Sequence, residues 1–299
     1  MKLIVSLCHM GNLADEIKTF LQDNDLQYVT LSENGIDAIQ TTGPGKSKGK
    51  IILPLEINAE TASEATVKST EIAAQIQRII NQTGDYPLII PEDRWRSNKR
   101  MTENRLLAHL GVFCQVYARN CEVRRIDKNT AQEFLSETHS YGYAACRYRY
   151  GIFLKRHTGH NIHDCEGIDV LSPGRLVAVA TFSNARKWLK AGKEIRSYEW
   201  TRYASLPQVR INGGMGKVLK AFSEDVNPDD IMSYADLEWS TGSAYDSLGF
   251  TLEGYKDPVI FCINTTDWSR KPVSTGEEAG LFLQNFGSNK YRLKLTEYQ

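Results

Sequence analysis

The segment most suited to ligand chemistry is a glycine-rich turn, Arg210-Ile-Asn-Gly-Gly-Met-Gly-Lys217. Without a Cβ atom, Gly213, Gly214 and Gly216 allow the backbone to approach a ligand closely. The helix expected directly after the turn would leave its first amides without intrahelical partners and would direct its positive dipole end at the same place. The turn therefore predicts a pyrophosphate site. Its candidate residues are Arg210, Gly213, Gly214, Met215, Gly216 and Lys217.

A second group of chemically capable residues is His157-x-x-His160-x-x-His163-x-Cys165. Imidazole and thiolate groups are ligand types that suit zinc. However, no second Cys/His pair lies nearby, and the spacing matches no zinc finger. We therefore expect no metal site here. Exposed loop histidines and histidines that contact a substrate phosphate both remain open alternatives.

The glycine turn needs a sheet and a helix to position it. Strand patterns cover 122–126, 148–154, 175–182, 197–204 and 230–235, and apolar side chains at helical spacing follow the turn at Met215, Val218, Leu219 and Phe222. Pro207 cannot donate to a strand ladder, so we expect pairing to break there and two neighbouring parallel strands to splay. A short helix at 243–248 precedes a strand expected to run from Gly249 towards 260–263. Thr130-x-x-Glu133 predicts a capping box at the start of another helix.

Residues 1–90 alternate between strand and helix patterns, which predicts a small α/β layer. Strands are expected at Leu3–Leu7, 27–31, 51–55 and 86–90. Helices are expected after a cap at Asn12 and near 60–81. Glycines 43, 45 and 49 stand among lysines but lack the order of a phosphate-binding P-loop, which favours a surface hairpin over a nucleotide site.

Charge is distributed unevenly along a chain whose 299 residues carry no net charge. Residues 91–157 hold 13 basic and 7 acidic side chains, whereas residues 1–90 hold 7 basic and 11 acidic ones. Arginines beside an aromatic residue at Arg94-Trp95-Arg96, followed by Lys99 and Arg100, predict a contact with a nucleic-acid backbone. Salt bridges to the acidic N-terminal part are the alternative.

The glycine turn and its helix resemble the acyl-CoA pyrophosphate loop of the GNAT acyltransferase superfamily. Tyr245-Asp-Ser-Leu-Gly-Phe250 resembles the late motif of the same superfamily. A narrower resemblance covers roughly 115–265 and points to a phage and mobile-element branch that includes Mom-like DNA-modifying proteins and Hef-like domains of homing endonucleases. It rests on Glu199-x-x-Arg202-Tyr203, Asn212 to Lys220, and Ser233-Tyr-Ala-Asp236.

The resemblance implies transfer of an acyl group from acetyl-CoA or a related acyl-CoA to an amine. For the Mom-like branch it implies the exocyclic amine of a DNA base. Tyr245 would be the general acid, Glu199 the general base, and Asp236 would orient the amine. Each residue also has a structural alternative: an aromatic packed on the sheet for Tyr245, an ion pair with Arg202 for Glu199, and a loop cap for Asp236.

These patterns predict an α/β N-terminal domain (1–90), a basic helical connector (91–120), an α+β GNAT-like domain with a splayed mixed sheet (121–267) and a C-terminal extension (268–299). We expect a cytoplasmic acyltransferase with free thiols and without a membrane segment, because no apolar stretch is long enough to span a bilayer. A non-catalytic DNA-binding module and a small-molecule or protein N-acetyltransferase remain alternatives. The sequence does not set the oligomeric state.

Overall fold

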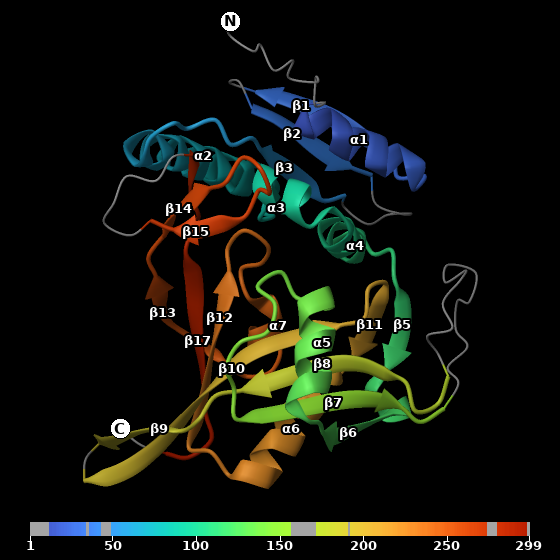
Figure 1. Ribbon diagram of the computed structural model, residues 1–299, viewed down its shortest axis with the longest axis vertical. Helices are drawn as coiled ribbons and strands as arrows, with labels where there is room; N and C mark the ends of the chain where they lie inside the picture. The colour runs from blue at the N-terminus through green and yellow to red at the C-terminus, as the bar shows by residue number, and fades with distance from the viewer. Residues whose placement is uncertain are drawn as a thin grey trace, which may run out of the picture. The chain divides into compact units, whose positions relative to one another are not determined.

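The computed structural model (Figure 1) describes residues 12–33, 36–42, 49–156, 172–190, 192–273 and 280–297. The expected strand at Leu3–Leu7 and most of the glycine and lysine loop at 43–48 lie outside these residues. The described chain is mixed α/β with several sheets and divides into two compact units. The first unit contains the chain up to Ser97 together with Val259–Phe286, and the second contains Asn98–Pro258 together with the chain from Gly287 onward.

The first unit is built on a four-stranded sheet of order β1-β2-β3-β4, in which only β3 and β4 are parallel. A second sheet has the order β15-β14-β16. The elements are α1 (Leu13–Asp23), β1 (Tyr28–Glu33), β2 (Ile36–Thr41), β3 (Ile51–Leu55), α2 (Ala62–Thr83), β4 (Leu88–Pro91), α3 (Glu92–Ser97), β14 (Ile260–Ile263), β15 (Arg270–Pro272) and β16 (Leu281–Gln284). The predicted cap of α1 is confirmed, because the side chain of Asn12 accepts a hydrogen bond from the Ala14 amide.

The second unit is built on a sheet of order β13-β17-β12-β10-β8-β7-β6, with β9 paired to β10. Every pair is antiparallel except β10 and β12. Its strands are β6 (Cys121–Arg125), β7 (Tyr148–Leu154), β8 (Leu176–Phe182), β9 (Arg186–Lys190), β10 (Lys193–Ser205), β12 (Asp230–Asp236), β13 (Thr251–Lys256) and β17 (Ser288–Lys294). The helices are α4 (Lys99–His109), α5 (Lys128–Thr138), α6 (Gly214–Val226) and α7 (Ser243–Asp246), with a 3-10 turn at Ala118–Asn120. A separate parallel pair joins β5 (Cys114–Tyr117) to β11 (Val209–Asn212).

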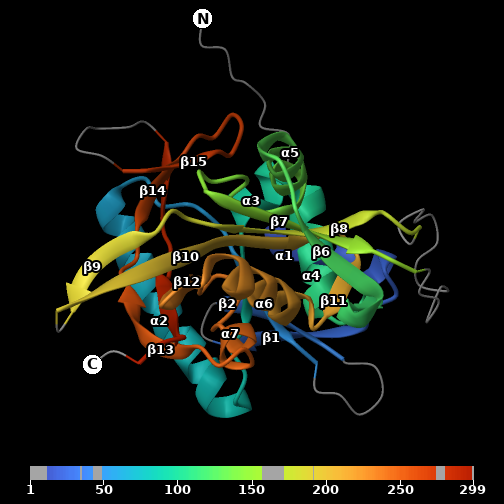
Figure 2. The same cartoon turned by 90° about the horizontal axis from the view of Figure 1, so that it is seen from below.

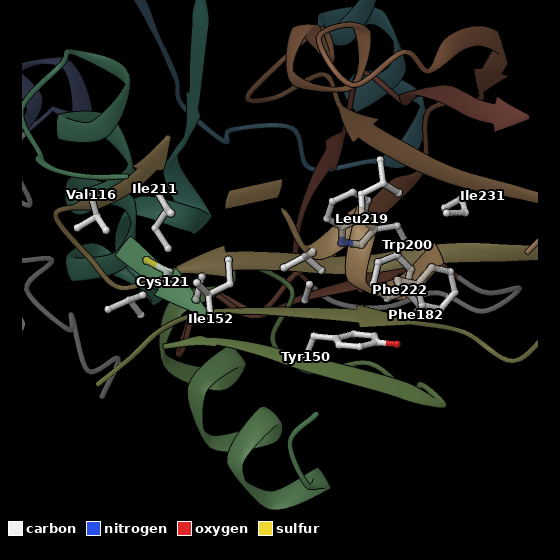
Figure 3. Close-up of a cluster of buried hydrophobic side chains, with 14 of the residues drawn as sticks. Val116, Cys121, Tyr150, Ile152, Phe182, Trp200, Ile211, Leu219, Phe222 and Ile231 are labelled. Carbon is white, nitrogen blue, oxygen red and sulfur yellow. The ribbon is translucent and has the colours of Figure 1, made fainter. Parts of the chain in front are cut away.

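Helices α5 and α6 cover opposite faces of this sheet (Figure 2). Side chains alternate along β8, so Val179 packs with Leu135 of α5, whereas Phe182 packs against Phe222 of α6 on the other face. The Phe182 and Phe222 rings are stacked with centroids 3.9 Å apart, and Tyr150 and Trp200 surround them (Figure 3). This aromatic cluster anchors α6, and with it the glycine turn that begins the helix.

Two local predictions were wrong. Helix α5 begins at Lys128 rather than after Thr130, because the Asp127 carboxylate accepts hydrogen bonds from both the amide and the hydroxyl of Thr130. The single strand expected from Gly249 towards 260–263 is two strands, β13 in the second unit and β14 in the first. Pro258 stands between them and cannot donate to a ladder.

The cysteines of the described chain only partly follow the expectation of free thiols. Cys121, Cys146 and Cys262 are free, whereas Cys114 is disulfide-bonded. No helix within the described ranges is long and apolar enough to cross a membrane.

The first unit should depend on a buried ion pair between Arg270 of β15 and Asp93 of α3. Arg270 binds Asp93 through two hydrogen bonds of 2.5 and 2.7 Å, and the side chains are only 6% and 1% exposed. Because Arg270→Ala leaves a buried carboxylate without its main partner, we expect it to destabilise this unit by about 3–5 kcal/mol. Urea denaturation followed by far-UV circular dichroism measures the change.

Lys18→Ala is the matched control, because it removes an exposed pair with Asp15 and should change stability by less than about 1 kcal/mol. Equal urea midpoints for Arg270→Ala and the wild-type protein would contradict this prediction.

Candidate functional site

The candidate site is centred on a split between the two parallel strands. β10 pairs with β12 only from Ser197 to Glu199, against Asp230 to Met232. Beyond these residues β10 continues along β8 as far as Ser205, and β12 continues along β17 as far as Asp236. A register shift between Trp200 and Arg202 coincides with the divergence. The predicted splay is present, but it begins before Pro207, because the irregularity in β10 turns the strand away from β12 first.

Ser233 spans the start of the split with its side chain. Its hydroxyl donates to the carbonyl oxygen of Trp200 at 2.9 Å, across the gap where a backbone ladder would otherwise continue. The same oxygen lies 2.7 Å from the phenol oxygen of Tyr245. Since the single Ser233 proton is directed at Trp200, the phenol of Tyr245 donates to Ser233. This chain of hydrogen bonds places Tyr245 beside the divergent strands.

Tyr245 is packed in an aromatic environment. Its ring lies 5.4 Å from those of Phe250 and Tyr291 and 6.4 Å from that of Trp200, centroid to centroid. Burial raises the pKa of the phenol, the negative charge of Glu199 adds to the increase, and the Ser233 hydrogen bond acts in the opposite direction. Tyr245 is therefore neutral at pH 7 and holds a proton at the split.

The other two predicted catalytic residues lie around the same opening. The Glu199 carboxylate interacts electrostatically with both Tyr245 and Arg202. Arg202 donates to the Gly142 carbonyl and lies 6.0 Å from the ring of Tyr141. The Tyr141 hydroxyl in turn donates to Asp236 at 2.7 Å. Tyr245, Glu199 and Asp236 are thus connected through Arg202 and Tyr141.

The glycine turn begins α6 as predicted. Gly213 is the N-cap residue with φ +76°, a left-handed conformation that favours glycine, and it makes no side-chain cap. The amides of Gly214, Met215 and Gly216 donate to no acceptor within the described chain. A Cβ atom at Gly216 would meet only a Leu248 methyl group at 3.4 Å. This helix end is therefore available to an anion.

Gly214 has a different structural reason to be glycine. A Cβ atom there would lie 2.7 Å from the Tyr203 hydroxyl and 2.9 Å from Ile211. Tyr203 is half-buried, burial raises its pKa, and its hydroxyl makes no hydrogen bond within the described chain. The turn therefore fits closely over Tyr203.

The side chains of the remaining predicted members of the turn make contacts elsewhere. The Lys217 ammonium group donates to the carbonyl oxygens of Ala118 at 2.7 Å and Cys121 at 2.5 Å, so it ties α6 to the chain before β6. Arg210 is exposed and its guanidinium lies 5.3 Å from the Phe113 ring. Met215 packs against the main hydrophobic core.

The four residues predicted to bind nucleic acid are not equivalent. Arg96 is mostly buried and pairs with Glu16 and Glu92, and the Nε and Nη2 atoms of Arg94 are also buried. Lys99 and Arg100 are exposed at the start of α4, in the other unit. The structure supports the salt-bridge alternative for Arg96.

A cavity of about 240 Å³ lies beside the split in the second unit. It is bounded by α4, the end of α5 and the stretch Tyr203–Val209, and includes Arg105, Glu137 and His139. Tyr203 lines this cavity, and its hydroxyl also lies close to Gly214 of the glycine turn. The first unit holds a separate cavity of about 520 Å³ between β3, α2 and β16, and none of the predicted site residues lines it.

Sequence reasoning did not assign Ser233, Tyr203 or Tyr141 to the site. Ser233 carried a readable signal, since it is a polar residue in phase with the buried Ile231 and Ala235 of a strand. Tyr141 and Tyr203 carried none, because their roles depend on contacts with Asp236 and Gly214, which are distant in sequence. The residues 157–165 considered for zinc lie outside the described chain, and the described residues contain no cluster suited to a metal ion.

Comparison with known proteins gives matches only among solved structures. No family model and no curated protein sequence matches the chain. A probable N-acyltransferase of unknown function from Enterococcus faecalis aligns at 14% identity and TM-score 0.32 over 50% of this chain, which spans only 36% of that protein. A GNAT-family acetyltransferase from Bacillus anthracis aligns at 12% identity and TM-score 0.31, covering 58% of this chain and 95% of its own. An N-acetyltransferase from Staphylococcus aureus aligns at 11% identity and TM-score 0.30, covering 58% and 97%.

The environment of Tyr245 leads to a spectroscopic prediction. Because burial raises its pKa, a smaller fraction of Tyr245 should be ionised at pH 10.5 than of an ordinary tyrosine. We expect the absorbance at 295 nm of the wild-type protein minus that of Tyr245→Phe to be smaller at that pH than the signal of an ordinary tyrosine. A difference equal to one full tyrosinate would contradict the prediction. Unfolding both proteins in guanidinium at the same pH supplies the control, since it must restore the full difference.

The same shift has a defined effect on stability. A raised pKa in the folded state contributes stability below the unfolded value near 10, and this contribution is lost as the pH rises above it. Stability should therefore fall more steeply above pH 10 for the wild-type protein than for Tyr245→Phe.

Proposed function

We propose that the second unit is an N-acyltransferase that takes its acyl group from an acyl-CoA-type thioester. The observation that carries the proposal is the split between β10 and β12, together with the uncapped start of α6. Strands that diverge expose backbone groups to an extended ligand, while the free amides of α6 favour a diphosphate. A donor with a diphosphate and a long amide-containing arm requires both features.

The residues at the split can perform the proton transfers that acyl transfer needs. The acceptor amine must lose a proton as it attacks the thioester carbon, and Glu199 would accept that proton. The C–S bond then breaks, and the departing sulfur takes a proton from the neutral phenol of Tyr245 after the phenol turns away from Ser233. Arg202 and Tyr141 are positioning residues, because they link Glu199 and Asp236 on the acceptor side.

A direct binding test uses acetyl-CoA and isothermal titration calorimetry. We expect Gly216→Asp to weaken binding at least about tenfold, because a carboxylate at the start of α6 repels a diphosphate. Gly254→Asp is the matched control, since a side chain at Gly254 meets nothing within 4 Å. No heat for the wild-type protein at millimolar acetyl-CoA, or equal binding by both variants, would overturn the donor site.

For the acceptor, we propose the exocyclic amine of a DNA base. Small-molecule amines and protein amines are the alternatives. A base in duplex DNA must leave the stack to reach the site, so single-stranded DNA should react faster. Mass spectrometry of nucleosides from cells that do and do not express the chain tests the DNA acceptor.

A panel of small-molecule and protein amines, with release of free thiol as the readout, tests the other acceptors. In this assay Tyr245→Phe and Glu199→Gln should each reduce turnover by about 100-fold or more.

A further inference from the structure

Strand β9 and the first part of β10 form a two-stranded ribbon at the edge of the second unit, called here the β9–β10 ribbon (Arg186–Lys190 and Lys193–Ser197). Its antiparallel register runs from Lys190 opposite Lys193 to Arg186 opposite Ser197. The ribbon extends away from the body of its sheet in both views (Figures 1 and 2). From 186 to 196 the chain carries five basic residues and one acidic residue, although the whole protein has no net charge.

The cations are concentrated on one face of the ribbon. Side chains alternate along a strand, and directly opposed residues share a face, so Arg186, Trp188, Lys190 and Lys193 lie together. Every ionisable side chain that the ribbon contributes to this face is therefore basic. Arg186 and Lys193 are exposed, and Trp188 is 37% exposed.

The Trp188 side chain is held in place by neighbouring residues of its own sheet. It lies opposite Ile195, which is fully buried, and its ring is 5.8 Å from the guanidinium of Arg292. Arg292 is itself fixed by Glu253 and Asp230. The indole is therefore a preorganised aromatic surface among cations, and ordering it costs little when a ligand binds.

The other face of the ribbon is different. Lys187 pairs with Glu194 at 3.0 Å, and Arg196 pairs with Asp229. Leu189, which is 76% exposed, also lies on this face. The exposed aliphatic side chain is thus separated from the cationic face, and this arrangement does not suit insertion into a lipid surface, where apolar side chains and cations approach together.

We propose that the cationic face of the β9–β10 ribbon binds the phosphate backbone of a nucleic acid. A two-stranded β ribbon has a width that the major groove of DNA admits. Arg186 and Lys190 are four residues apart, about 13 Å along the strand, so they reach separate phosphates. Trp188 between them provides a stacking surface for an unpaired base. The inference does not depend on the proposed acyl transfer, because no residue of this face belongs to the split or the glycine turn.

The test is fluorescence anisotropy with a labelled 24-base-pair duplex and a single strand of the same length, at 50–200 mM NaCl. Lys190→Glu combined with Lys193→Glu should weaken binding at least about tenfold and reduce the slope of log affinity against log salt by about one to two. Lys128→Glu combined with Lys271→Glu is the control, since it makes the same change in net charge at two exposed lysines elsewhere. Trp188→Ala should weaken binding of the single strand more than binding of the duplex.

Thermal midpoints first establish that each variant is folded. If the double glutamate variant is not folded, Arg186→Ala combined with Lys193→Ala decides, because both side chains are exposed. Failure of the wild-type protein to bind at 50 mM NaCl, or equal loss in the control variant, would overturn the proposal. Binding to phosphatidylglycerol vesicles without binding to either oligonucleotide would also overturn it. Acetyl-CoA titration of the same ribbon variants should be unchanged, so the two proposals can fail separately.

Discussion

The arrangement of the second unit depends on one hydroxyl group at the point where two strands part. Where β10 and β12 stop pairing, each loses a run of backbone hydrogen bonds, and buried groups left unpaired are costly. Ser233 compensates at this point, since its hydroxyl satisfies the Trp200 carbonyl and also fixes Tyr245. An apolar side chain at this position would leave the carbonyl unpaired. One side chain therefore stabilises the opening of the sheet and also fixes the phenol of Tyr245 beside it.

The separation of the strands also explains the position of the glycine turn. After Ser205 the chain leaves the sheet and pairs in parallel with β5, so that β11 and α6 begin beside a different part of the unit. Lys217 then binds two carbonyl oxygens around the 3-10 turn, which fixes α6 along the chain entering β6. The positive charge therefore has a structural task. At the proposed diphosphate site, the positive potential comes from backbone amides and the helix dipole rather than from a lysine side chain.

Sequence patterns predicted the features that depend on neighbouring residues and missed those that depend on distant ones. The Asn12 cap, the start of a helix directly after the glycine turn and the apolar face of α6 follow from local geometry, and all three are present. The sequence predicted that strand pairing would break at Pro207. In the structure the strands diverge at the register shift that follows Trp200, because the register of β10 is set by its partner β8. The division between β13 and β14 and the contact of Tyr141 with Asp236 depend on chain segments that no local pattern relates.

The distribution of charge along the sequence is also an incomplete guide to which cations could bind a ligand. Part of the basic excess of residues 91–157 is neutralised by ion pairs within the fold, since Arg96 pairs with Glu16 and Arg125 pairs with Asp225. In the β9–β10 ribbon, by contrast, the alternation of side chains along the strands places the ion pairs of Lys187 and Arg196 on one face and three cations around one indole on the other. A count along the sequence cannot distinguish these cases, because only the pairing of strands shows which cations share a surface and which already have a carboxylate.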